Sequence, residues 1–134
     1  MMNNFMTLIV DDEHLNRLLM KKFLATGGIP YAEATDGQEA IDWIKGSTEK
    51  QIIVLLDLNM PVMDGYEFLE YLSYHQDEFS DKKILIVIVS ASEYTVFRQN
   101  APNAEIVQYI SKPVSKDVLI DVVWQAAENL QTVF

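Results

Sequence analysis

The sequence predicts an α/β fold in which a parallel β-sheet is covered by helices on both faces. Short apolar runs, which suit buried strands, alternate along the chain with amphipathic stretches, which suit helices. The alternation continues through five strand–helix units without a repeat or a long polar linker. At 134 residues the chain has the length of one domain with one core, so we expect a single domain over residues 1–134.

The first two units each join a strand to a helix with a recognisable boundary. Residues 5–10 form the first predicted strand, and residues from about 12 to 26 form a helix that Gly27–Gly28 ends. Residues 31–35 form a weaker strand, and Asp36–Gly37 opens the second helix. The predicted buried faces of these helices are Leu15, Leu18, Leu19 and Phe23 in the first and Ala40, Ile41 and Ile44 in the second.

The other three units repeat the pattern. Strands are predicted at 52–56, 84–89 and 105–110, and helices at about 64–74, 92–99 and 115–131. Apolar residues at core spacing are Phe68, Leu69 and Leu72 in the first of these helices and Leu119, Val122, Val123, Ala126 and Leu130 in the last.

The polarity of the strands predicts their order in the sheet. The first, third and fourth strands are almost entirely apolar, as central strands buried on both faces must be. The second strand carries Glu33, and the fifth carries Glu105 and Gln108, so these two suit the edges. We therefore expect a doubly wound, flavodoxin-like (βα)5 sandwich with strand order 2-1-3-4-5, whose ligands bind at the carboxyl ends of the strands.

Composition excludes several classes of function. The formal charge of −10 leaves little basic surface for nucleic acid, and the absence of cysteine excludes disulfides and thiolate metal sites. The longest apolar run, at 84–89, is far shorter than a membrane span, and the N-terminus lacks the features of a signal peptide. We therefore expect a cytoplasmic protein that binds neither nucleic acid nor membrane.

Reactive side chains follow four of the predicted strands at their carboxyl ends. Asp11 and Asp12 follow the first strand, Asp57 the third, Ser90 the fourth and Lys112 the fifth. In a parallel sheet these ends share one rim, so three carboxylates, a hydroxyl and an ammonium are expected in one pocket. The three acids and the lysine sum to −2, which a divalent cation such as Mg²⁺ would balance. With its charge balanced, Asp57 could act as a nucleophile towards a phosphoryl group.

The same stretches closely resemble the receiver (CheY-like) domains of two-component response regulators. The matching motifs are "VDD" (10–12), "LLDLNMPVMDG" (55–65), "IVSAS" (88–92) and "YISKP" (109–113). They occur in order, and the resemblance covers almost the whole chain. It implies that residues 1–134 form a single receiver domain with no output domain.

The resemblance also implies a role for each site residue. Asp57 corresponds to the phosphoacceptor, and Lys112 to the lysine that contacts the phosphoryl group. The Mg²⁺ site, which Mn²⁺ can also fill, would consist of Asp11, Asp12, Asp57 and the backbone carbonyl of Asn59. Ser90 and Tyr109 correspond to the switch residues, and Pro113 to a proline after a cis peptide bond.

A receiver of this kind is a phosphorylation-controlled binding module and not an enzyme with a turnover of its own. The resemblance implies that Asp57 takes its phosphoryl group from a histidine kinase or a histidine phosphotransfer protein. The change would then reach the surface formed by the segments at 92–99, 105–110 and 115–131. That surface would bind an unknown downstream protein or a second copy of the chain.

Other interpretations of the same residues remain open from the sequence alone. Asp12 could be the N-cap of the first helix, whereas Asp64 suits a cap or turn better than a ligand. A phosphohydrolase acting through an aspartyl phosphate would usually carry an acid at position 59, where this chain has asparagine. A flavin carrier would need a phosphate loop where this chain has "DDEHLNR", and a scaffold that is never phosphorylated would not need every reactive position filled.

Overall fold

The computed structural model describes residues 4–91 and 104–131 as a five-stranded sheet with helices on both faces. The elements are β1 (Met6–Val10), α1 (His14–Thr26), β2 (Tyr31–Ala34), α2 (Gly37–Gly46), β3 (Gln51–Leu56), α3 (Gly65–Tyr74), the short 3₁₀ helix η1 (Gln76–Phe79), β4 (Lys83–Ser90), β5 (Ala104–Ser111) and α4 (Lys116–Gln131). The helix predicted at 92–99 lies outside the described residues. The sequence did not predict η1.

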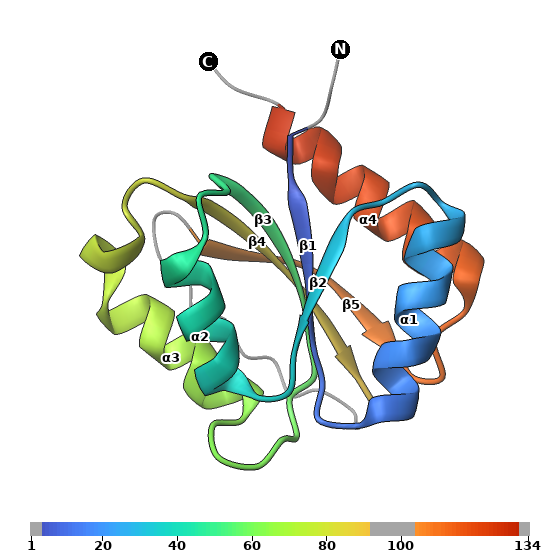
Figure 1. Ribbon diagram of the computed structural model, residues 1–134, viewed down its shortest axis with the longest axis horizontal. Helices are drawn as coiled ribbons and strands as arrows, with labels where there is room; N and C mark the ends of the chain where they lie inside the picture. Colours follow the sequence, from blue (N-terminus) through green and yellow to red (C-terminus); the bar gives the residue numbers. More distant parts are fainter. Residues whose placement is uncertain (1–3, 92–103, 132–134) are drawn as a thin grey trace.

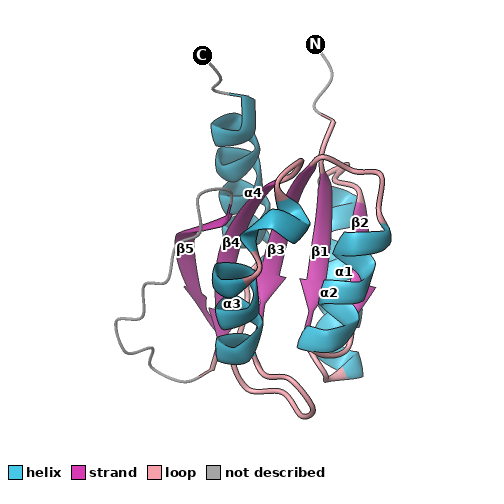
Figure 2. Ribbon diagram, turned by 90° about the vertical axis from the view of Figure 1, so that its left-hand side faces the viewer, coloured by secondary structure: helices cyan, strands magenta, loops and turns pink. Residues whose placement is uncertain are grey.

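The sheet has the predicted strand order, β2-β1-β3-β4-β5, and all four neighbouring pairs are parallel. Figure 2 shows the five strands side by side with their arrowheads at one end. The flavodoxin-like fold is therefore confirmed, with the two polar strands at the edges. Because every strand points the same way, the residues that follow β1, β3, β4 and β5 lie on a single rim.

Two apolar cores lie on opposite faces of the sheet. In Figure 1, α2 and α3 cover one face while α1 and α4 cover the other. Alternate residues of β3 serve the two cores: Val54 and Leu56 face α2 and α3, whereas Ile53 and Leu55 face α1 and α4. The helix residues predicted for these cores, in α2, α3 and α4, are all buried.

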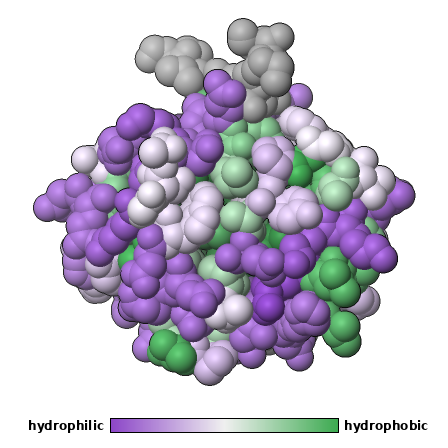
Figure 3. All heavy atoms as spheres, viewed as in Figure 1, coloured by the Kyte–Doolittle hydropathy of each residue, from purple (hydrophilic) through white to green (hydrophobic). Residues whose placement is uncertain are grey.

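The predicted buried face of α1 is correct only at Phe23, which is half-buried and packs against the core on the α1 and α4 side. Leu15 is 74% exposed, and Leu18 and Leu19 are 41% and 42% exposed, whereas Met20 and Leu24 are the buried residues of the helix. Figure 3 shows hydrophobic side chains on the surface over α1, at the right of the view. This helix is apolar on more than one side, so one of its apolar stripes faces solvent next to the rim. We call Leu15, Leu18 and Leu19 the α1 patch.

Side-chain caps explain where α2 and α3 begin. The carboxylate of Asp36 accepts a hydrogen bond from the Glu39 N–H at 2.9 Å, and Asp64 forms a capping box with Glu67. Asp64 is therefore a cap, as predicted. In the described part of the chain, none of the helices is sufficiently long and apolar to span a bilayer.

Candidate functional site

Backbone hydrogen bonds continue the strand ladder one residue past the strand ends and so position the reactive residues. The Asp57 N–H donates to the Val10 carbonyl at 3.0 Å, and the Lys112 N–H donates to the Ser90 carbonyl at 3.0 Å. Asp11 is held in the same way, because its N–H donates to the Ala34 carbonyl at 3.2 Å. The backbone of the site is thus as fixed as the sheet itself.

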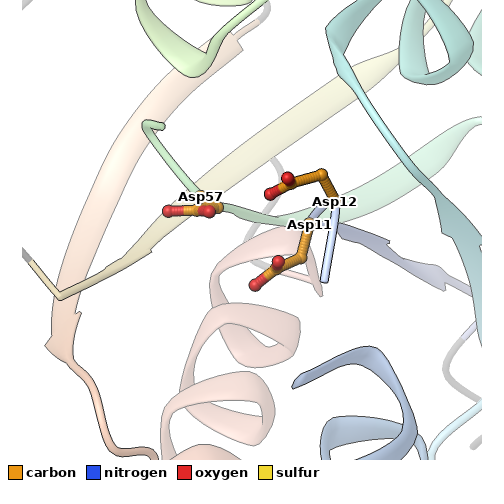
Figure 4. Close-up of side chains that lie close together, drawn as sticks. All are labelled: Asp11, Asp12 and Asp57. Carbon is orange, nitrogen blue, oxygen red and sulfur yellow. The ribbon is translucent and has the colours of Figure 1, made fainter. Parts of the chain in front are cut away.

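Three carboxylates meet at this rim. Asp11, Asp12 and Asp57 each offer a carboxylate oxygen, and these oxygens lie within 4.8 Å of one another. Figure 4 shows the three side chains close together beyond the ends of β1 and β3. Asp11 and Asp57 are buried, at 0% and 6% exposed, whereas Asp12 faces solvent. Such a concentration of negative charge is unfavourable unless a cation offsets it.

Lys112 supplies one positive charge from the opposite side of the cluster. Its Nζ donates to Asp11 Oδ2 at 2.8 Å and lies 3.5 Å from Asp57 Oδ2. The other oxygen of Asp11, Oδ1, accepts a hydrogen bond from the Glu13 N–H at 2.9 Å. Asp11 is therefore anchored at both carboxylate oxygens, while Asp57 keeps more freedom to react.

Burial and charge shift the pKa of two groups in the site. Burial raises the pKa of the Asp57 carboxyl above its ordinary value; Lys112 opposes this shift and the Asp11 charge adds to it. Burial by itself would lower the pKa of Lys112, but its hydrogen bond to Asp11 and the two carboxylate charges raise that pKa overall. Lys112 therefore stays protonated at neutral pH and is available to an incoming anion.

Two glycines let the segment after Asp57 fold tightly. A Cβ at Gly65 would lie 2.6 Å from the Asp57 carbonyl oxygen, closer than a real side chain can approach. The Gly65 N–H also donates to the Leu58 carbonyl at 3.0 Å. At Gly37, the N–H donates to the Met63 carbonyl at 2.8 Å, and a Cβ there would meet the same carbonyl. The first residue of α2 thus holds the loop between β3 and α3 in place through its hydrogen bond to Met63.

An open cavity of about 270 Å³ gives access to the acids. It is lined by Asp12, Glu13, Asp57, Asn59, Ala91 and Lys112. Asn59 is exposed, and its N–H lies 3.4 Å from Asp57 Oδ1. The cavity has room for a metal ion and a small anion together. Its residues come from the ends of β1, β3, β4 and β5.

The chemistry of this donor set fits a hard divalent cation. Mg²⁺ is bound through a few carboxylates and completes its shell with carbonyl and water oxygens. The three carboxylates and Lys112 carry a net charge of −2, which such an ion would neutralise. The open side of the cavity leaves space for water ligands. Asp11, Asp12 and Asp57 can therefore hold a metal ion.

The remaining predicted residues, Ser90, Tyr109 and Pro113, are not among those that line this cavity. Ser90 is the last residue of β4 and is 4% exposed. Tyr109 is paired with Ile88 in the sheet and packs, half-buried, against the core on the α2 and α3 side. The Lys112–Pro113 peptide bond is cis, the isomer that the resemblance implied.

The structure rules out the alternative role of Asp12 as a helix cap and adds a residue that the sequence did not single out. Asp12 is not the N-cap of α1, because that position is Glu13, which makes no side-chain cap. Glu13 itself lines the cavity. Arg17 was missed: its guanidinium donates to the Asp11 carbonyl at 2.9 Å. The only signal for it was its position one turn into the helix that follows the acids.

Comparison with known proteins agrees with this site. The family model for the response regulator receiver domain matches residues 7–124. Sporulation initiation phosphotransferase F of Bacillus subtilis is 29% identical over 122 residues, covering 91% of this chain and 93% of that protein. The sensor histidine kinase CheAY of Helicobacter pylori is 29% identical over 90% of this chain. This chain spans only 15% of that kinase and 7% of the hybrid signal transduction histidine kinase L of Dictyostelium discoideum.

Solved structures give the same result. A CheY-like receiver domain protein from Methanospirillum hungatei superposes with a TM-score of 0.68 at 26% identity, covering 94% of this chain and 98% of that one. The Ssk1 receiver domain of Saccharomyces cerevisiae, solved with the histidine phosphotransfer protein Ypd1, gives 0.76 at 25% identity, with 100% and 95% covered. A sensor kinase receiver domain from Pseudomonas aeruginosa, solved with magnesium in its active-site cleft, gives 0.72 at 20% identity, with 92% and 97% covered.

The fold, the acidic rim and the family match lead to one conclusion. A receiver is a signalling module of two-component systems and not an enzyme such as a phosphohydrolase, nor is it a flavin carrier. The three acids and Lys112 occupy the rim where the sequence predicted them. This chain belongs to the response regulator receiver domain family.

Proposed function

We propose that this receiver accepts a phosphoryl group on Asp57 in a reaction that depends on Mg²⁺. The observation that carries the proposal is the arrangement of Asp57 in an open cavity, flanked by two acids that can hold a metal ion and by Lys112. The donor is the phosphohistidine of a histidine kinase or of a histidine phosphotransfer protein. Asp57 and Lys112 are thus the residues that act on the phosphoryl group.

In the transfer, an Asp57 carboxylate oxygen forms a new bond to phosphorus as the phosphorus–nitrogen bond of the donor histidine breaks. The histidine nitrogen keeps the electron pair of that bond. Lys112, 3.5 Å from Asp57 Oδ2, donates to the phosphoryl oxygens and stabilises their charge. Asp11 keeps the ammonium of Lys112 in place through its 2.8 Å hydrogen bond.

The metal ligands in this proposal are Asp11, Asp12, Asp57 and the backbone carbonyl of Asn59. A bound Mg²⁺, or Mn²⁺ in its place, would offset the negative charge of the acids and of the phosphoryl oxygens. The magnesium seen in the cleft of the Pseudomonas receiver domain supports this assignment. Asp12, the exposed acid, is the ligand most open to exchange with water.

A phosphoryl group on Asp57 then acts on the rest of the domain through Ser90 and Tyr109. The Ser90 hydroxyl donates to the phosphoryl oxygens, and the Tyr109 ring turns inward into the space that this movement vacates. The affected surface includes β5 and α4 and the segment at 92–99, which lies outside the described residues. This surface binds a downstream protein or forms a homodimer.

The partners follow from the same chemistry. The Ssk1 receiver was crystallised with a histidine phosphotransfer protein, which supports a phosphohistidine donor here. The α1 patch begins beside the acids and offers an apolar surface on which such a donor could dock. The net charge of −10 disfavours nucleic acid as a partner, and we place the protein in the cytoplasm, where its donors act.

The test is phosphorylation by a small acyl phosphate, followed by intact mass. The mass of the protein is expected to rise by one phosphoryl group with Mg²⁺ and to stay unchanged when the metal is chelated. Asp57→Asn removes the nucleophile and should abolish the gain, whereas Asp64→Asn, which changes an acid that only caps α3, should not. A gain that survives in Asp57→Asn would refute the proposal.

A further inference from the structure

Arg17 joins the acidic rim to the edge of the sheet. Its Nη1 donates to the Asp11 carbonyl at 2.9 Å, and its Nε donates to Glu33 Oε1 at 2.9 Å. Lys21 donates to the other oxygen of Glu33 at 2.8 Å. The Arg17 side chain is only 12% exposed, whereas the Glu33 side chain is 38% exposed, so the contact with the Asp11 carbonyl is the more buried of the two. Arginine suits this place because its planar fork can hold two acceptors at once.

The carbonyl that Arg17 holds belongs to the peptide that joins Asp11 to Asp12. The Asp11 side chain is already fixed by the Glu13 N–H and by Lys112. The Asp12 carboxylate is exposed, and among residues 4–91 and 104–131 the structure gives it no hydrogen-bond partner. The direction in which Asp12 leaves the backbone therefore depends on the orientation of that peptide, which the guanidinium fixes.

We infer that Arg17 is a positioning residue for the metal site: it orients the Asp11–Asp12 peptide and thereby presents Asp12 to the cation. The inference rests on the proposed function, since it assumes that Asp12 is a metal ligand. Glu33 completes the arrangement by holding the guanidinium against the edge strand β2. Residues that orient metal ligands in this way commonly change metal affinity about 10-fold or more when they are replaced.

The charge of Arg17 and its positioning role can be separated by experiment, because their loss should change the Mg²⁺ affinity in opposite directions. Removing a positive charge close to an acidic site should by itself strengthen the binding of a cation. Removing a group that orients a ligand should weaken it. Lys21 provides the matched control: it lies on the same helix and pairs with the same Glu33, but within the described part of the chain it contacts that carboxylate and no group of the site.

The experiment measures the Mg²⁺ dissociation constant of the unphosphorylated protein by calorimetry in wild type, Arg17→Met, Arg17→Lys and Lys21→Met. We expect Arg17→Met to weaken Mg²⁺ binding about 10-fold. Arg17→Lys, which keeps the charge but not the fork, should also weaken it. Lys21→Met should bind as tightly as wild type or more tightly. Thermal unfolding of the metal-free proteins reports any loss of stability separately. If Arg17→Met does not fold, the Mg²⁺ affinity of Arg17→Lys tests the inference in its place.

Two results would overturn the inference. One is an Arg17→Met affinity equal to or tighter than that of wild type, and the other is an equal loss in Arg17→Met and Lys21→Met, which indicates a general structural role. Failure of the proposed function has a different signature, because the wild-type protein itself would then neither bind Mg²⁺ nor gain a phosphoryl group. A phosphorylatable wild type with unaffected Arg17 variants refutes the role of Arg17 alone.

Discussion

At the scale of single residues, Asp57 is a carboxylate in a place that disfavours its charge. Burial raises its pKa, and the neighbouring Asp11 adds to the shift despite the opposing effect of Lys112. The folded protein therefore binds a proton at Asp57 more tightly than the unfolded chain does. The contribution of Asp57 to the free energy of unfolding is therefore greatest below the ordinary carboxyl pKa, about 4. It falls as the pH rises through the raised pKa and stays low above it.

Asp57→Asn should consequently stabilise the metal-free protein at pH 7, because asparagine carries no charge to bury. The gain should shrink as the pH falls towards about 4, where Asp57 of the wild type is protonated as well. Thermal unfolding of both proteins with a chelator, at a series of pH values, measures the difference. A variant that is less stable at pH 7, or a difference that does not change with pH, would contradict this account.

The sequence predicted which residues gather at the rim better than it predicted what holds them. The positions of Asp11 and Asp57 follow from the sequence because each comes directly after an apolar run, and Lys112 comes two residues after the fifth predicted strand. The contact between Arg17 and the Asp11 carbonyl depends on how α1 lies against β1 and β2. A long side chain can reach many acceptors, so its partner cannot be inferred before that packing is known.

At the scale of elements, α1 packs against the sheet on one side and exposes an apolar surface beside the site on another. Its buried residues are Met20 and Leu24, while the α1 patch is exposed. The helical spacing of its apolar residues fits two overlapping faces, so sequence periodicity grouped the half-buried Phe23 with three exposed leucines. The buried residues of α2, α3 and α4 were predicted correctly.

Replacing two residues of the α1 patch, Leu15→Ser with Leu18→Ser, should separate docking from chemistry. Phosphotransfer from a phosphorylated histidine phosphotransfer protein is expected to slow about 10-fold or more, because apolar contact area with the donor is lost. Phosphorylation by a small acyl phosphate should stay at the wild-type rate. Rapid-quench measurement of both reactions tests this. Equal slowing of the two, or of neither, would show that the patch does not dock the donor.

The matched control for that experiment is Val118→Ser on α4. Val118 is 48% exposed, so its replacement removes a similar exposed apolar side chain from another helix. Transfer from the histidine phosphotransfer protein should be unaffected in this variant. Thermal unfolding of the patch variants reports any loss of stability separately, because Leu15 is 74% exposed but Leu18 only 41%.

At the scale of the whole molecule, the reactive rim is connected to β5 through the sheet. Ser90 pairs with Ser111, and Ile88 pairs with Tyr109, so a shift at the end of β4 acts directly on the neighbouring edge strand. Strand order made this connection predictable, since the fourth and fifth strands had to be neighbours. The segment that joins them, 92–103, lies outside the described residues, and the predicted helix within it stays a prediction.

Ser90→Ala should therefore uncouple phosphorylation from its effect on the rest of the domain. The mass gain with an acyl phosphate and Mg²⁺ is expected to remain, because Ser90 is not the nucleophile. Amide chemical shifts in β5 and α4 should change on phosphorylation in the wild type and far less in the variant. Wild-type-like shifts throughout β5 in Ser90→Ala would remove Ser90 from the switch.

The close contact of Gly65 with the Asp57 carbonyl packs the start of α3 directly against residue 57. With no space for even a methyl group between them, residue 57 and the start of α3 move as one body, and Gly37 ties α2 to the same body. Any strain that a bulky charged adduct introduces cannot relax in that direction. We therefore expect a phosphoryl group on Asp57 to affect the paired ends of β4 and β5 more than the start of α3.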